Sequence, residues 1–358
     1  MNIRMKTMMG THHSWSIVAR SLALSFLKLN NNLYLESING HEDIPEELIR
    51  SFDLKIFSPD IDLSYTLPRN FEKRFLTKSK SKIAIYNYDS DILPREWKSM
   101  DKYVDWILPS SNYSKEVFLK SGWNEDKLIV VPHGVSYDEF NNNDGRCKDI
   151  DDNYFNFLNI SIPHYRKNLD LLVLAYYLEF EGNNNVCLNI KTTVKNPKHY
   201  FELNVLDKIK DIQRSLPGIK LPKINILTSK YKSMVPLYNS ADCYISTTSS
   251  EGFGMTFLEA MFSGLLVVAP HQTGQKDFLN NKNSLEIEGD FKNSPKEYQY
   301  WSPSANSKTF FPSVDSIRKN MRMAYENSFV EKRKNAFSDS TRYTWDSAAR
   351  KILGLKDG

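Results

Sequence analysis

The sequence predicts an α/β chain with two domains, each built on a parallel β-sheet. Its 358 residues exceed the usual size of one such domain and fit two. In both halves, short apolar runs that end in polar or Gly/Pro residues are mostly followed by a helical pattern, which is the alternation of a parallel sheet. The polar segment 141–145 (NNNDG) separates the two series and reads as a linker. We therefore expect domains at 1–140 and 141–340.

The individual elements follow from the apolar runs. In the first half we expect a helix from about Trp15, because Val18, Leu22 and Phe26 share one face. From residue 286 to 311 the pattern dissolves into a polar and aromatic loop. The expected strands are 3–9, 33–38, 54–57, 82–88, 106–108 and 127–131 in the first series, and 155–162, 187–193, 224–227, 243–247 and 265–269 in the second.

Composition narrows the class of protein. The chain is 41% hydrophobic and 25% charged, which is typical of a globular protein, and its apolar stretches are too short to span a bilayer. Three widely separated cysteines favour a reducing, cytoplasmic location. A net charge of +4 is too small to indicate nucleic acid. Residues 69–82 carry six basic side chains against one acid, which suits peripheral contact with anionic lipid or an acidic acceptor, or an ordinary solvated surface.

The most informative stretch is 241–278, which has the pattern of a complete βαβ unit. Gly252 and Gly254 allow a tight turn after the strand, a helix follows over 255–262, and Gly264 ends it before the buried strand LLVVA. Ligands of parallel sheets bind beyond the carboxyl ends of the strands, so 251–255 and 271–276 are expected to line one rim.

Two carboxylates belong to this unit. Glu251 lies in the turn and Glu259 one turn inside the helix, where its carboxylate can accept two hydrogen bonds from a vicinal diol such as a ribose. The helix start offers backbone N–H groups and partial positive charge, which favour an anionic or hydroxyl-rich ligand. The spacing therefore suits a sugar at one acid and a nucleoside at the other.

These residues resemble the signature of the retaining GT-B glycosyltransferases, the group that includes glycogen and sucrose synthases. The signature is EGFG, a Glu eight positions after the first, a small-residue strand and a Gly-containing loop. The likeness implies two Rossmann-like domains that face each other across a cleft and a nucleotide diphosphate sugar as donor. It also extends to VPHGV at 131–135 and to 343–353, which resembles the C-terminal helix that returns to the first domain, so 341–358 would join it. The matching residues are Glu251, Gly252, Phe253, Gly254, Glu259 and Gly274.

By this resemblance, Glu251 would lie beside the donor sugar and Glu259 would bind the ribose. The amides of residues 253–256, Met255 and Thr256 included, would hold sugar hydroxyls and phosphate. The leaving diphosphate also needs fixed cations. Arg166 and Lys167 follow the expected strand 155–162 and open the next helix. The family usually has an Arg near the strand end, where this chain has Ser161 and Ile162; Arg166 is the candidate substitute, and its role stays open.

The first domain supplies further candidates. Gly10, His12 and His13 lie in the loop after the first strand, as does the family's glycine-rich loop, and are expected to contact the donor. Many relatives have a His after a middle strand of this domain. Here IAIYNYDSDILPREW has none, so Asp89 is the candidate for binding the acceptor hydroxyl or the sugar.

No metal or other cofactor is expected beyond the nucleotide sugar. The strings 60–62 and 89–91 read Asp-x-Asp, a weak pattern, and the cations and helix starts can do a metal's work. The predicted function is retaining transfer of a hexose from a UDP- or GDP-linked donor to a glycan, lipid-linked or protein acceptor. Two alternatives stay open: a nucleotide-sugar epimerase of the same fold, and an inactive sugar-nucleotide-binding protein.

Overall fold

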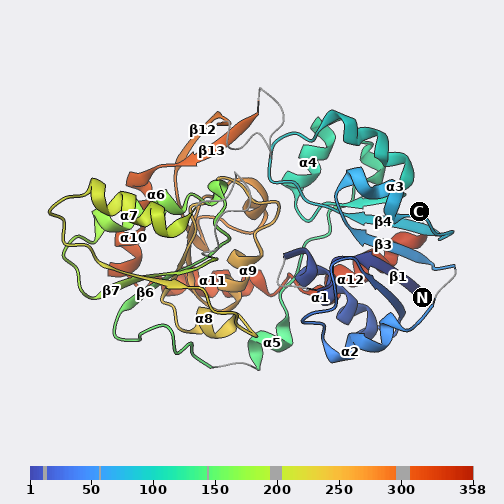
Figure 1. Cartoon of the computed structure of the whole chain (residues 1–358), viewed down its shortest axis with the longest axis horizontal. Coiled ribbons are helices and arrows are strands. Elements are labelled where there is room, and N and C mark those ends of the chain that lie inside the picture. The colour runs from blue at the N-terminus through green and yellow to red at the C-terminus, as the bar shows by residue number, and fades with distance from the viewer. Residues whose placement is uncertain (11–13, 56–57, 143–144, 194–203, 296–306, 358) are drawn as a thin grey trace. The chain divides into compact units, whose positions relative to one another are not determined.

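The computed structural model describes residues 1–10, 14–55, 58–142, 145–193, 204–295 and 307–357. Contacts divide the chain into two compact units. The first comprises Met1–Tyr88, Ile92–Ser136 and Tyr343–Gly358, and the second comprises Asp89–Asp91 and Tyr137–Arg342. Each unit carries its own parallel sheet (Figure 1).

The sheet of the first unit has five parallel strands in the order β2-β1-β3-β4-β5. Apolar side chains such as Ile3, Leu63 and Ile83 are fully buried in it. Helix α1 packs on one face, and α4 covers the other, where Phe118 contacts Tyr86 (Figure 1). The elements are β1 (Asn2–Thr7), α1 (Ser14–Lys28), β2 (Asn32–Ser37), α2 (Glu46–Ile49), β3 (Ile61–Tyr65), α3 (Phe71–Arg74), β4 (Ser81–Ile85), β5 (Trp106–Leu108) and α4 (Asn112–Lys120).

The strand β3 contains a buried carboxylate, which explains why its sequence gives a weak strand signal. Asp62 is fully buried and lies opposite Arg4 of β1, whose Nη1 is 2.8 Å from the Asp62 Oδ1. Arg4 also bonds Glu36, and Thr77 donates to Asp62. A buried charge of this kind is tolerated because it is paired and hydrogen-bonded.

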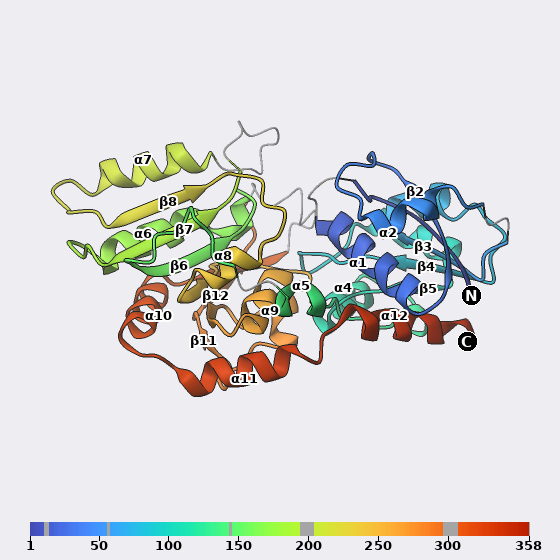
Figure 2. The ribbon, with the colours of Figure 1, turned by 90° about the horizontal axis from the view of Figure 1, so that it is seen from below.

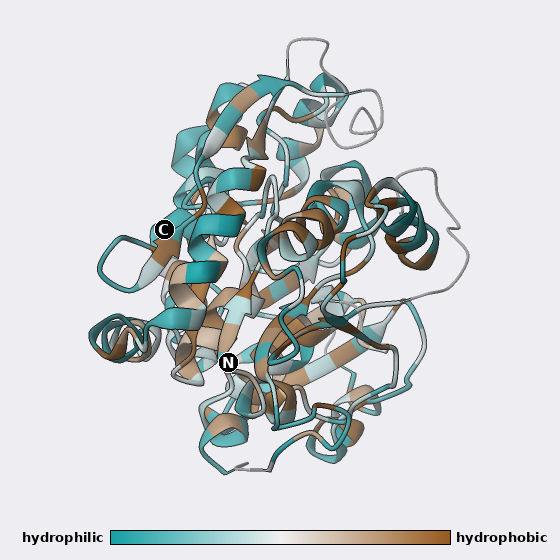
Figure 3. Ribbon diagram, turned by 90° about the vertical axis from the view of Figure 1, so that its left-hand side faces the viewer, coloured by the Kyte–Doolittle hydropathy of each residue, from teal (hydrophilic) through white to brown (hydrophobic). Residues whose placement is uncertain are grey.

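The sheet of the second unit has six parallel strands in the order β11-β10-β9-β6-β7-β8, with helices on both faces. Helices α6, α7 and α10 share one hydrophobic core on one face. On the other face α9 packs against α11, and Phe257 of α9 contacts Tyr244 of β9. Figure 2 shows the same sheet from below, and Figure 3 shows the brown apolar sides that helices carry beside their teal polar sides.

The elements of this unit are α5 (Tyr137–Asn141), β6 (Phe155–Ile160), α6 (Leu169–Glu179), β7 (Val186–Lys191), α7 (Val205–Ser215), β8 (Lys223–Leu227), α8 (Val235–Asn239), β9 (Cys243–Ile245), α9 (Met255–Phe262), β10 (Leu266–Ala269), β11 (Ser284–Glu286), α10 (Val314–Glu326) and α11 (Val330–Ser340).

Three sequence expectations about strands are wrong. Residues 54 and 55 lie outside any strand, 56–57 fall outside the described residues, and β3 forms further along. In place of a strand at 127–131, the chain has a 3-10 turn at Glu125–Lys127 and a single bridge from Leu128 to Ile107. The expected loop at 286–311 overlaps β12 (Gly289–Asn293) and β13 (Lys308–Pro312), an antiparallel pair, and its residues 296–306 fall outside the described residues. Every residue of β12 is exposed, so the strand lacks the apolar alternation on which sequence analysis depends.

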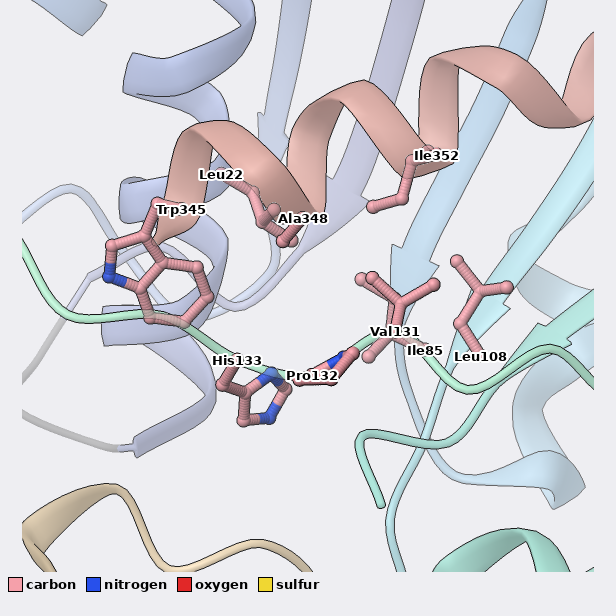
Figure 4. A pocket seen from close by; sticks show the side chains of 9 residues that line it. All are labelled: Leu22, Ile85, Leu108, Val131, Pro132, His133, Trp345, Ala348 and Ile352. Carbon is pink, nitrogen blue, oxygen red and sulfur yellow. The ribbon is translucent and has the colours of Figure 1, made fainter. Parts of the chain in front are cut away.

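The C-terminal segment packs on the first unit. The helix α12 (Trp345–Leu353) contacts α1, and the Val135 N–H donates to the Tyr343 carbonyl at 3.0 Å. A Cβ on Gly134 would lie 2.3 Å from the Thr344 carbonyl carbon, so only glycine fits under the crossing chain. Figure 4 shows the apolar pocket under α12, which Leu22, Ile85, Leu108 and Ile352 help to line. Its volume of about 10 Å³ is no more than one water needs.

None of the described helices combines the length and the apolar character that crossing a bilayer requires.

Candidate active site

The tight turn between β9 and α9 depends on a glycine. Gly254 has φ of 99° and caps α9, a left-handed conformation that a residue with a side chain rarely adopts. A Cβ there would also lie 2.5 Å from the Phe257 ring. Phe253 is buried against Phe278, with ring centroids 5.2 Å apart. The tight turn therefore brings backbone amides to the start of α9, where the first N–H groups have no partner within the helix.

The loop after β10 packs directly on this turn. The Gly274 N–H donates to the Glu251 carbonyl at 2.9 Å, and the Glu251 N–H donates to the Thr273 hydroxyl at 3.0 Å. A Cβ on Gly274 would lie 2.5 Å from the Gly252 carbonyl, so the two loops approach as closely as glycine permits. The two expected rim loops, 251–255 and 271–276, are thus in contact at the carboxyl edge of neighbouring parallel strands.

A third loop, between β6 and α6, joins the other side of the turn. The Ser249 N–H donates to the Arg166 carbonyl at 2.7 Å, and the Thr247 hydroxyl donates to the Lys167 carbonyl at 3.0 Å. The Asn168 side chain donates to the Thr247 carbonyl at 2.8 Å. These bonds fix the backbone of the two basic residues against the turn that carries Glu251.

Four charged side chains meet where these loops join. Glu251 accepts from Lys167 at Oε1, and its Oε2 lies 3.1 Å from the Arg166 Nη1. The Arg166 Nη2 lies 3.0 Å from the Asp89 Oδ2, and the Gly252 N–H donates to the Asp89 Oδ1 at 2.8 Å. Asp89 belongs by its contacts to the second unit. The cluster contains two positive and two negative groups, and the Lys167, Arg166 and Glu251 side chains are each 11–13% exposed.

Comparison with known proteins gives the fold. Residues 161–294 match the family model described as "Glycosyl transferases group 1". The chain is similar to the sucrose-phosphate synthase of Thermosynechococcus elongatus, with a TM-score of 0.71, 12% identity and 99% and 98% of the two chains covered. It is also similar to Anabaena HepE in complex with UDP, with a TM-score of 0.68, 14% identity and both chains fully covered. The chain has the GT-B glycosyltransferase fold.

A curated relative adds a sequence match. The "Probable sucrose-phosphate synthase" of Thermosipho melanesiensis is 23% identical, over 71% of this chain and 54% of the relative. The chain therefore spans about half the length of this relative. The family match covers the stretch from the end of β6 to β12, which includes the three joined loops of the GT-B second unit.

Charge pairing sets the protonation of the cluster in this GT-B unit. Burial alone would raise the pKa of Glu251, but Arg166 and Lys167 outweigh it and hold that pKa at about 2. Burial lowers the pKa of Lys167, assisted by the Arg166 charge and opposed by Glu251. The pKa of Asp89 is raised, chiefly by burial, against the attraction of Arg166. Glu251 is consequently ionised at neutral pH and acts as a hydrogen-bond acceptor, not as an acid.

Glu259 has a different environment. Its Oε2 accepts from the Tyr238 hydroxyl at 2.6 Å, and the side chain is partly buried. Burial raises the pKa of Glu259 to about 7, opposed by the Tyr238 hydrogen bond and assisted by the Glu139 charge. Next to it, the Tyr244 hydroxyl donates to the Thr256 Oγ1 at 2.7 Å. Near neutral pH, Glu259 is thus present in both its neutral and its charged form. A ligand that donates hydroxyl hydrogen bonds to it would favour the carboxylate.

The structure brings most of the candidate residues of this GT-B chain together. Glu251, Lys167, Arg166 and Asp89 form one ionic cluster, and Gly252, Phe253, Gly254 and Gly274 build the turn beside it. Met255, Thr256 and Glu259 follow on α9. Gly10 belongs to the first unit, where its N–H donates to the Asn39 Oδ1 at 3.0 Å. His12 and His13 lie outside the described residues.

Two histidines with shifted pKa values were not among the candidates. His164 is buried, and burial with the nearby Arg166 and Lys167 lowers its pKa to about 2, so the neutral Nδ1 accepts from the Arg166 N–H at 3.1 Å. His133 is buried in the first unit, where burial lowers its pKa to about 3 and its Nε2 lies 3.2 Å from the Asn87 Nδ2. The run Pro163-His164-Tyr165 before the two cations was the signal that could have indicated the first.

The two Asp-x-Asp strings have different surroundings. Asp60 bonds the Lys80 ammonium at 2.6 Å and the Asn2 N–H at 2.9 Å, while Asp62 is paired with Arg4. Asp91 accepts from the Lys308 N–H at 2.9 Å. Across the described ranges, no three His, Cys, Asp or Glu side chains are grouped so that they could hold a metal ion.

Proposed function

We propose that this chain is a retaining glycosyltransferase that transfers a hexose from a UDP- or GDP-linked donor to a glycan, lipid-linked or protein acceptor, without a metal. The observation that carries the proposal is the joined set of loops at the carboxyl edge of the second sheet. It combines two partly buried cations, an ionised Glu251 and a helix start within one turn of Glu259. Anionic, hydroxyl-rich ligands are what such an edge binds.

The cations are suited to the diphosphate. When the bond between the anomeric carbon and the diphosphate oxygen breaks, negative charge develops on that oxygen, and fixed positive groups stabilise it without reorganisation. Lys167 and Arg166 are held in place through backbone bonds from Thr247 and Ser249. In the protein alone their charges are balanced by Glu251 and Asp89. The α9 N-terminus adds partial positive charge.

Glu251 and Glu259 would hold the two ends of the donor. The ionised Glu251 accepts hydrogen bonds from hydroxyls of the transferred sugar and stabilises positive charge that develops at its anomeric carbon. Glu259 accepts bonds from the ribose hydroxyls, and binding of these donors lowers its pKa from about 7. The acceptor hydroxyl then attacks from the face that the diphosphate leaves, and the departing phosphate oxygen takes its proton, which gives net retention.

Three further features belong to the proposal. The similarity to a UDP complex of HepE favours a UDP-linked donor over a GDP-linked one. No cofactor beyond the nucleotide sugar is required, because the cations supply the charge stabilisation. The three cysteines are buried and unpaired, which supports a cytoplasmic location.

The direct test is incubation of the purified chain with UDP- and GDP-linked hexoses, with and without a metal chelator, followed by NMR of the anomeric proton. Release of the sugar or its transfer with the donor's anomeric configuration, unaffected by chelator, is the expected result. Inverted product would overturn the retaining mechanism, and loss of activity with chelator would overturn the metal-independent one. An isomerised nucleotide sugar would show an epimerase, and binding without turnover would show a binding protein.

A further inference from the structure

The first unit carries a basic surface segment that the proposed donor site does not use. Residues 69–82 contain six basic side chains and the single acid Glu72. The segment runs from the 3-10 turn Pro68–Asn70 through α3 to the start of β4, and all of it is described. The segment lies at the surface and carries net positive charge, which suits a negatively charged partner.

Two aromatic residues hold the segment to the body of the unit. Phe71 is fully buried and contacts Phe75 and Trp123, with ring centroids 5.8 and 6.3 Å apart. Phe75 is 3% exposed, whereas its neighbour Leu76 is 73% exposed, a larger fraction than for any other exposed large hydrophobic residue of the described chain. The anchored Phe75 therefore fixes Leu76 at the surface.

The basic side chains around Leu76 point to solvent. Arg69, Lys73 and Lys78 are exposed, and within the described ranges none of them lies within salt-bridge distance of a carboxylate. Lys80 is also exposed and is paired with Asp60 at 2.6 Å. We use the name Leu76 patch for Arg69, Lys73, Leu76, Lys78 and Lys80.

The one acid of the segment is hydrogen-bonded to a neighbouring tyrosine. Glu72 accepts a hydrogen bond from the Tyr103 hydroxyl at 2.7 Å, which links α3 to the 3-10 helix Arg95–Tyr103. That helix adds the exposed Lys102, whose ammonium lies 5.1 Å from the Tyr103 ring centroid. Positive charge therefore extends beyond the segment itself.

We propose that the Leu76 patch is a docking surface for an anionic lipid bilayer. Each Lys or Arg near an anionic membrane surface contributes about 1 kcal/mol of attraction, so several unpaired ones give appreciable binding. A protruding leucine gains from insertion among acyl chains, whereas an acidic polysaccharide offers it nothing apolar. The combination of unpaired bases with one fixed, exposed leucine thus favours a lipid surface over an acidic glycan. The proposal does not depend on the proposed transfer activity.

The test is co-sedimentation of the full chain with phosphatidylcholine vesicles that contain or lack phosphatidylglycerol. The wild type is expected to bind only the anionic vesicles, and less at high salt. Lys73→Gln with Lys78→Gln should reduce the partition coefficient roughly tenfold to thirtyfold. Leu76→Asn should reduce it roughly threefold to tenfold. The matched control, Lys208→Gln with Lys210→Gln, removes the same charge from the exposed face of α7 and should leave binding unchanged.

Two outcomes overturn the proposal. Equal loss in the Leu76 patch variant and the α7 control would show attraction to overall charge alone. Binding to soluble heparin that Leu76→Asn leaves intact, together with no sedimentation on anionic vesicles, would assign the patch to an acidic polysaccharide. Thermal unfolding of each variant confirms that the comparison is between folded proteins, which is expected because all the replaced side chains are exposed.

Discussion

Replacement of Glu259 by Gln is expected to stabilise the protein at pH 8 much more than at pH 5. Burial raises the pKa of Glu259 to about 7, above the ordinary value of 4.5. The pKa of Glu259 is higher in the folded than in the unfolded chain. The protonated carboxyl therefore makes its full contribution to stability below about pH 4.5, and this contribution is lost as pH rises through about 7. The difference between the two pKa values corresponds to roughly 3 kcal/mol in the free energy of unfolding. Partial exposure of the side chain reduces this to about 1–3 kcal/mol.

Thermal unfolding measures this difference. For a unit of the size of the second one, 1 kcal/mol shifts the melting temperature by about 2–4 °C, so Glu259→Gln should melt roughly 2–10 °C above the wild type at pH 8. The gain at pH 5 should be small. Glu288→Gln makes the same chemical change at an exposed position and serves as the control. An equal shift at both pH values, or a lower melting temperature at pH 8, would refute the reasoning.

The remaining predictions concern packing and charge. Gly274→Ala places a Cβ 2.5 Å from the Gly252 carbonyl and should cost about 1–3 kcal/mol in urea unfolding; a neutral result would mean that the two loops separate easily. Asp62→Ala leaves the buried Arg4 with Glu36 alone and should cost roughly 3 kcal/mol, so an unchanged urea midpoint would show that this pair does not stabilise the sheet. Glu251→Gln should lower turnover roughly a hundredfold while UDP affinity holds or rises, because a negative charge beside the cations is removed; weaker UDP binding would contradict this.

The parallel sheets were predictable because strands such as β4, β9 and β10 contain short buried apolar runs. The helix α9 has the bounds that the sequence predicts, since Gly254 and Gly264 mark its ends. Where a strand carries polar residues the signal fails: β3 contains the paired Asp62, and β12 is exposed throughout. Such strands are stabilised by partners distant in sequence, which a local pattern does not reveal.

The composition of the site was predictable, but its charge balance was not. Spacing and resemblance indicated Glu251, Arg166 and Lys167 as separate contributors to ligand binding. The structure pairs them with one another, because loops after two different strands meet at one edge of the sheet. This pairing sets the low pKa of Glu251, and burial beside the same two cations lowers the pKa of His164; both effects depend on distances that sequence alone does not supply.

Calorimetric titration of UDP and GDP into the wild type, Lys167→Ala and the surface control Lys208→Ala tests whether Lys167 binds the diphosphate of the donor. We expect at least one of the two nucleotides to bind the wild type and the control equally. Lys167→Ala should bind it at least about tenfold more weakly, since a buried charged contact to the diphosphate is lost. Failure of both nucleotides to bind, or identical affinity in all three proteins, would contradict this expectation.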